Sequence, residues 1–277
     1  MAKQYKRNAV LAAAISGVLA FGASAVSALD LKMSADTAML KAGDSTMLKV
    51  WLEDATGTMV SAGADTIVNI ASSDTSVIDA LSFIMAAGET STTTSVVGSS
   101  AGQTDMTAST TTLNAAAVPL AVVADYLPGA TPAGTTTTFL GGVSKNGGSY
   151  DNPQTATGTD SLDILVTVNP GTEDQGKQAK LVNVVYFYDA PGNYLSFGGP
   201  YWTWELTANG FATWDWENDA ALNGYANVTL GSSHSNNLYN GKLEGMEGTY
   251  LFFNGYETAD GTLVYTNPLG TVGLTVD

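Results

Sequence analysis

The feature that most constrains the fold is a succession of short strand-like runs, separated by turns rich in Gly, Asn and Asp. In residues 45–52 (STMLKVWL), Leu48, Val50 and Leu52 alternate with a second set of side chains. Successive side chains of a strand point to opposite faces, so we expect these three to face a core. Runs of this kind recur about every ten residues along the chain. The pattern predicts an all-β fold with many turns.

Residues 1–28 have the parts of a secretory signal peptide. Three basic residues precede an apolar, small-residue run at residues 9–25, and Val26-Ser27-Ala28 supplies small side chains for cleavage. The run is rich in Ala, Gly and Ser and no basic flank follows it, which is unfavourable for a membrane span. We predict that this segment is cleaved and that the rest is exported; an uncleaved N-terminal anchor is the alternative.

Charge and cysteine content exclude several classes of function. All 26 Asp and Glu lie after residue 28, against seven Lys and no Arg. Nucleic acid is excluded as a partner because phosphate binding needs clustered Lys and Arg, and an anionic membrane surface is disfavoured. The chain has no Cys, so it forms no disulfides, thiolate metal sites or cysteine nucleophile. Stability must therefore come from buried apolar area.

Residues 29–124 are predicted to form a first sandwich-like domain. Strands are expected at 45–52 and 66–70, and those at 91–97 and 104–108 are expected to pair around Gly102.

This region resembles a bacterial Ig-like domain of the invasin and intimin type. The resemblance lies in residues 49–78 (KVWLEDATGTMVSAGADTIVNIASSDTSVI) and 92–110 (TTTSVVGSSAGQTDMTAST). The matching positions are Asp54, Gly57, Val60, Gly63, Ala64, Ala101, Gly102, Met106, Thr107 and Ala108. The resemblance implies a stalk or spacer module on a cell surface, with no catalytic residues.

Residues 125–160 are predicted to be a connector. The segment contains prolines, the Thr135–Thr138 run and two Gly-Gly pairs, with one short apolar strand expected near Phe139-Leu140.

Residues 161–277 are predicted to form a second antiparallel β-sandwich. Residues 180–188 (KLVNVVYFY) make an apolar strand suited to a sheet interior, and further strands follow at regular spacing. The order of 166–170 (VTVNP) and 243–258 (LEGMEGTYLFFNGYET) is similar to a module found at the C-terminus of secreted bacterial surface proteins. That resemblance implies location and architecture, and no activity.

Four tryptophans, Trp202, Trp204, Trp214 and Trp216, lie within a short stretch of the second domain. Tryptophans beside carboxylates are typical of glycan-binding faces, so the four are candidate ligand-binding residues. Core packing is the competing interpretation, because Trp202 and Trp204 alternate with polar residues and are expected to point inward. A glycosidase would need Glu205 with Asp215 or Glu217 at a defined separation.

Asp215, Glu217 and Asp219 are a candidate metal site, spaced at alternate positions. In a loop their oxygens could converge on Ca²⁺, although the segment does not match an EF-hand; a solvated acidic strand end is the alternative. His234 is the only histidine and lies in a polar stretch at 231–237. It is predicted to be an exposed loop residue, which argues against a triad or a His-based metal site.

Together these features predict two tandem Ig-like β-sandwiches in an exported, non-enzymatic structural or adhesion protein. We expect it in the extracellular space or at the cell surface, with the periplasm as an alternative, and binding a protein, a glycan or itself. Two alternative functions stay open. One is a carbohydrate-binding module that uses the tryptophans, and the other is a self-assembling filament or surface-layer subunit that pairs exposed edge strands. No catalytic residues are assigned, and Ca²⁺ is the one cofactor considered.

Overall fold

The computed structural model describes residues 29–113, 116–130, 134–189, 202–215, 221–266 and 271–277. Within these ranges the chain forms strands, turns and loops and no helix, which confirms the predicted all-β class. No described segment is therefore a helix long and apolar enough to cross a bilayer. The predicted signal peptide, residues 1–28, lies outside the described residues.

The first nine strands are β1 (Asp30–Ala35), β2 (Met39–Lys41), β3 (Ser45–Glu53), β4 (Met59–Val60), β5 (Thr66–Ser72), β6 (Leu81–Met85), β7 (Ser91–Val97), β8 (Gly102–Ser109) and β9 (Ala116–Val123). The others are β10 (Gly129–Ala130), β11 (Thr138–Lys145), β12 (Tyr150–Asp151), β13 (Gln154–Ala156), β14 (Leu162–Asn169), β15 (Gln178–Tyr188), β16 (Trp202–Thr207), β17 (Gly210–Thr213), β18 (Ala226–Thr229), β19 (His234–Gly241), β20 (Gly248–Thr258), β21 (Leu263–Thr266) and β22 (Val272–Val276).

The first sandwich is built from β1–β9. One sheet holds β1, β3, β4 and β7, and the other has the order β2-β9-β8-β5-β6. Leu48, Val50 and Leu52 face the core between them and are buried, as the alternation along β3 predicts. Side chains of both sheets interdigitate there, as in other aligned sandwiches.

The expected pairing of residues 91–97 with 104–108 is wrong. β7 pairs with β3, whereas β8 pairs with β5 and β9, so the two strands lie in different sheets. Gly102 stands where the chain enters the second of these sheets. A Cβ there would lie 2.5 Å from Cγ2 of Val77. This glycine permits a close approach of β8 to Val77, in the turn between β5 and β6, and does not make a hairpin turn.

The second sandwich packs a four-stranded sheet, β12-β11-β14-β19, against a nine-stranded sheet centred on β20 and β15. β15 and β20 pair over ten residues, which confirms the prediction that residues 180–188 lie inside a sheet. The core includes Phe139, Ile164 and Tyr256, each fully buried. Pairing is antiparallel except for two short parallel contacts, β2 with β9 and β13 with β22.

The segment predicted as a connector, residues 125–160, contributes strands to the second sandwich. β11 pairs with β14 over eight residues and is buried along most of its length. Of the two Gly-Gly pairs that suggested a linker, Gly141-Gly142 lies inside this strand and Gly147-Gly148 lies after its end. A Cβ at Gly141 would be 2.6 Å from Val272, and one at Gly142 would be 3.0 Å from the backbone of Tyr150. Glycine is therefore required here for close packing.

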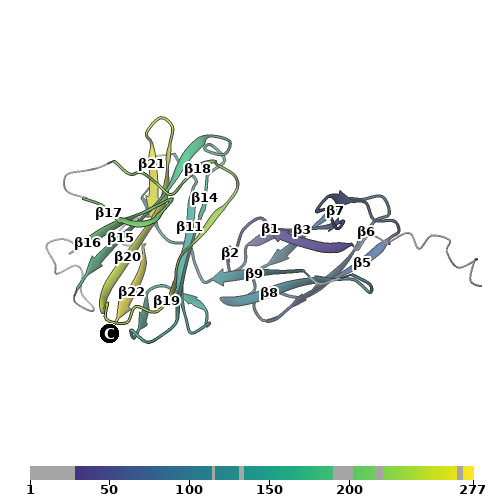
Figure 1. Ribbon diagram of the computed structural model, residues 1–277, viewed down its shortest axis with the longest axis horizontal. Coiled ribbons are helices and arrows are strands. Elements are labelled where there is room, and N and C mark those ends of the chain that lie inside the picture. Colours follow the sequence, from purple (N-terminus) through teal and green to yellow (C-terminus); the bar gives the residue numbers. More distant parts are fainter. Residues whose placement is uncertain (1–28, 114–115, 131–133, 190–201, 216–220, 267–270) are drawn as a thin grey trace, which may run out of the picture.

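The two sandwiches lie end to end along the long axis of the molecule, with β2 and β9 next to the second sandwich (Figure 1). A small apolar cluster fills the junction and contains Met39, Ala121, Val123, Leu140 and Tyr150, all buried. The side-chain amide of Gln103 donates hydrogen bonds to Ser144 Oγ at 2.8 Å and to the carbonyl of Gly148 at 2.5 Å. The two sandwiches therefore contact each other through packed side chains as well as through the chain that connects them.

Candidate functional site

The tryptophans predicted as a glycan platform lie on opposite faces of one sheet. Trp202 pairs in register with Phe187, a core residue of β15, and Trp204 lies on the same face. Their ring centroids are 5.4 and 5.9 Å from that of Phe187. Trp214 instead stacks with Tyr186 at 6.5 Å on the other face. The three described tryptophans therefore do not form one surface, and Trp216 lies outside the described residues.

The inward-facing tryptophans differ in exposure. Trp204 packs half-buried against the core, whereas Trp202 keeps 48% of its surface exposed. Trp204 also lines an apolar groove of about 260 Å³ together with Phe211 and Met246. This volume lies below the ~300 Å³ at which small-molecule pockets begin. The two tyrosine hydroxyls of the groove are already engaged, since Tyr239 donates to the Lys242 carbonyl and Tyr250 to the Met246 carbonyl.

The carboxylates near the tryptophans are only partly described. Asp215 is exposed, while Glu217 and Asp219 lie outside the described residues, so the calcium site stays a prediction. Elsewhere in the described chain, no group of three or more His, Cys, Asp or Glu is arranged to hold a metal. Glu205 is 2% exposed and accepts hydrogen bonds from Asn223 Nδ2 at 3.0 Å and the Gly224 N–H at 2.5 Å. The Glu205 carboxylate therefore holds the loop that contains Asn223 and Gly224 in place.

His234 does not lie in an exposed loop, so that prediction is wrong. It opens β19, an edge strand that pairs with β14, and its imidazole is half-buried. Nε2 accepts a hydrogen bond of 3.0 Å from the Gly231 N–H. Burial lowers the pKa of the imidazole, which favours the neutral form that this bond requires. Residues 231–233 form a loop, as predicted, whereas the polar residues from His234 to Asn237 belong to the edge strand β19.

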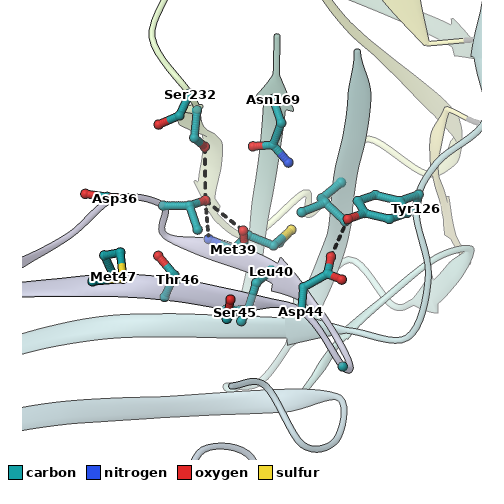
Figure 2. Close-up of a pocket in the computed structure, with 14 residues that line it drawn as sticks. Asp36, Met39, Leu40, Asp44, Ser45, Thr46, Met47, Tyr126, Asn169 and Ser232 are labelled. Atoms are coloured by element: carbon teal, nitrogen blue, oxygen red, sulfur yellow. Dashed lines mark hydrogen bonds between the residues drawn. The ribbon is translucent and has the colours of Figure 1, made fainter. Parts of the chain in front are cut away.

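A polar cleft with a volume of about 550 Å³ lies at the junction of the sandwiches (Figure 2). The first sandwich contributes the β1–β2 loop and the start of β3. The opposite side of the cleft is formed by Tyr126, Leu140, Asn169 and the Ser232-Ser233 loop. We call this the junction cleft. It was missed by sequence analysis because its residues share no motif and are far apart in the sequence; Thr37 and Ser233, for example, are 196 positions apart.

Two hydrogen bonds at the junction cleft join residues that are far apart in the sequence. Ser233 Oγ donates to Thr37 Oγ1 at 3.0 Å, and the Tyr126 hydroxyl donates to the Asp44 carboxylate (Figure 2). Burial and the bond to Asp44 raise the pKa of Tyr126 to about 12, so this hydroxyl stays protonated at neutral pH. Together with the bonds of Gln103, these contacts fix the relative orientation of the sandwiches on more than one side.

No family of known sequences and no curated protein matches the chain. Among solved structures it is similar to a putative membrane-anchored protein from Corynebacterium diphtheriae, with a TM-score of 0.33, 12% identity and 89% of this chain covering 58% of that one. The D0-D1 domain of intimin gives a TM-score of 0.30 at 14% identity, with 89% and 97% of the two chains covered. Domains 5–6 of the S-layer protein SbsC give 0.30 at 17% identity, with 88% and 95% covered. Structural similarities with TM-scores this low do not indicate a function.

Proposed function

We propose that this chain is an exported, non-enzymatic structural or adhesion protein of the cell surface, in which both sandwiches act as one rigid, elongated unit. Such a unit would hold its outer surfaces at a fixed distance and orientation for protein partners. The observation that carries the proposal is the packed junction between the sandwiches. Five buried side chains contributed by both sandwiches, together with the hydrogen bonds of Gln103, hold this junction, which favours a spacer that keeps its shape.

Two side chains considered for catalysis in the sequence analysis, His234 and Glu205, are engaged in structural hydrogen bonds. His234 Nε2 accepts a backbone hydrogen bond, and Glu205 is buried under two hydrogen bonds. Neither presents a free group toward a cleft, which supports a role through surfaces.

Surface labelling of intact cells tests the proposed location. Cells that produce the full-length chain are treated with a membrane-impermeant, amine-reactive biotin reagent, and a cytoplasmic protein serves as the control. We expect the seven lysines after residue 28 to be labelled without lysis, while the control stays unlabelled. Labelling only after lysis would contradict the proposal.

Self-assembly is a second candidate function, favoured by one specific observation. Ile67 on β5 and Ile84 on β6 are cross-strand partners and are 60% and 59% exposed. β6 ends its sheet, with no further strand beside it in the described chain. An exposed apolar edge is a template for pairing with another copy. Electron microscopy of the purified chain should then show fibres that are absent from an Ile84→Lys variant, and monodisperse particles in both would contradict this candidate.

A further inference from the structure

We propose that the junction cleft is a binding site for a neutral saccharide. This inference goes beyond the structural role above and does not depend on it, because a spacer needs no ligand at its junction. Clefts between domains are frequent locations for small-molecule sites.

The Thr46 hydroxyl provides the first observation. Thr46 is 5% exposed and lines the junction cleft, and its Oγ1 has no hydrogen-bond partner in the described part of the chain. Figure 2 shows this oxygen pointing from β3 toward the segment that carries Asp36. Buried hydroxyls in folded proteins are nearly always hydrogen-bonded. An unpaired hydroxyl at the wall of a cleft therefore indicates that a bound molecule supplies the partner.

Further polar groups line the same cleft from both sandwiches. Asp36 and Ser45 lie on the side of the first sandwich, and Asn169 and Ser232 on the side of the second (Figure 2). Asn169 Nδ2 donates to Thr138 Oγ1 at 3.4 Å, which leaves the amide oxygen for a ligand. The cleft thus offers hydroxyls that donate or accept, together with carboxylate and amide oxygens that accept.

The chemistry of the lining selects the ligand class. Met39, Leu40 and Leu140 give apolar surface beside the polar groups, which suits a molecule with both C–H faces and hydroxyls. Asp36 and Asp44 are the charged side chains of the lining, and no Lys or Arg belongs to it, so an anionic ligand is disfavoured.

The size of the cleft favours a saccharide over a metal ion as its ligand. Its volume of about 550 Å³ lies within the ~300–1,000 Å³ of small-molecule sites. A bare Ca²⁺ needs six to eight oxygens at about 2.3–2.6 Å, and the two carboxylates that line this space belong to no group of three or more metal-ligating side chains in the described chain. A neutral polyhydroxylated molecule of one or a few sugar rings fits both the volume and the donor set.

The test measures binding to the whole exported chain. Methyl glycosides of glucose, galactose, mannose and N-acetylglucosamine are titrated by ligand-observed NMR, and a glycan array extends the search to oligosaccharides. Thr46→Val keeps the shape of the side chain and removes the unpaired hydroxyl. We expect its melting temperature to be unchanged or raised, and its affinity for the bound glycan to fall at least about tenfold.

Thr104→Val is the matched control. Thr104 is also a buried β-strand threonine of the first sandwich, but its hydroxyl bonds with Ser72, Ser73 and the Asp74 N–H. This variant should have a lower melting temperature and unchanged affinity.

Three results would overturn the proposal. The first is that no glycan binds, and the second is that Thr46→Val binds as well as the wild type while Trp202→Ala does not. The third is that Ca²⁺ alone raises the melting temperature and Asp36→Asn abolishes that effect, which would make the cleft a cation site. The surface-labelling result is independent of all three, so the two proposals can fail separately.

Discussion

The Gln103 side chain on β8 reaches across the junction to the Gly148 carbonyl, 45 residues further along the chain, and also to Ser144. Removing it with Gln103→Ala should cost about 1–3 kcal/mol of junction stability, because two hydrogen bonds to the second sandwich are lost. Small-angle scattering of the whole chain should show a broader distribution of lengths. Gln175→Ala is the control, since that side chain donates to Pro170 within one sandwich. Identical scattering from both variants would contradict a junction held by Gln103.

Tyr256 should stabilise the second sandwich through its hydroxyl. This buried group donates to Asp174 Oδ2 at 2.6 Å and lies 2.8 Å from Thr137 Oγ1. Tyr256→Phe leaves the buried Asp174 carboxylate with one partner fewer, so we expect a loss of about 1.5–3 kcal/mol in the free energy of unfolding. Urea denaturation measures this loss. Tyr239→Phe, which removes a more exposed hydroxyl, should cost less than about 0.5 kcal/mol; equal losses would contradict the prediction.

The two inward-facing tryptophans should differ in their contribution to stability. Trp204→Ala removes a side chain packed on the core and should cost about 3 kcal/mol, whereas Trp202→Ala should cost about 1 kcal/mol because half of its indole is exposed. Chemical denaturation of the two variants checks the order. A larger loss for Trp202→Ala would show that this indole is covered in solution.

Acid should destabilise the protein below about pH 4. Hydrogen bonds from the Thr258 hydroxyl and the Thr262 N–H lower the pKa of Asp260 to about 2, and backbone N–H groups lower that of Glu173 to about 2. Their unfolded pKa values are near 4, so their stabilisation is complete above that pH and is lost as the pH falls toward 2. Melting temperatures in about 1 M salt, which screens repulsion among the carboxylates, should fall over this range. Asp260→Asn should show a shallower fall, and an equal slope would contradict the assignment.

Calcium should raise the melting temperature if Asp215, Glu217 and Asp219 bind it as the sequence predicts. A ligand at a hundred times its Kd adds about 2.7 kcal/mol to the free energy of unfolding. Scanning calorimetry in millimolar Ca²⁺ and in EDTA measures the shift, which Asp215→Asn should reduce and Asp79→Asn should not. Equal melting temperatures in the two buffers would remove the cation hypothesis.

Local hydrophobic patterns were sufficient to predict one core strand in each sandwich. Leu48, Val50 and Leu52 on β3 are buried because a half-exposed strand must divide its side chains between two faces. The continuous apolar run of β15 likewise predicted a strand with neighbours on both sides, as found. These hydrophobic patterns involve residues that are close together in the sequence, so they can be recognised in a single sequence.

Glycine and polar residues misled the sequence analysis where tertiary contacts decide the structure. Gly141 and Gly142 are typical of a linker, but they lie in a strand whose neighbours leave no space for a Cβ. Residues 231–237 were predicted to be a loop, but from His234 on they form β19, an edge strand that can be polar on its outer side. The junction cleft was not predictable, because its polar groups come together only when two separately folded sandwiches dock.

The pairing of the first and last strands has a mechanical consequence. Among the described strands, β1 is hydrogen-bonded only to β3, whereas β22 lies between β20 and β13 and is bonded on both sides. If tension were applied along the long axis through these two strands, β1 would detach first and β22 would hold. A surface spacer built in this way would lengthen by extending its first sandwich while the second stayed folded.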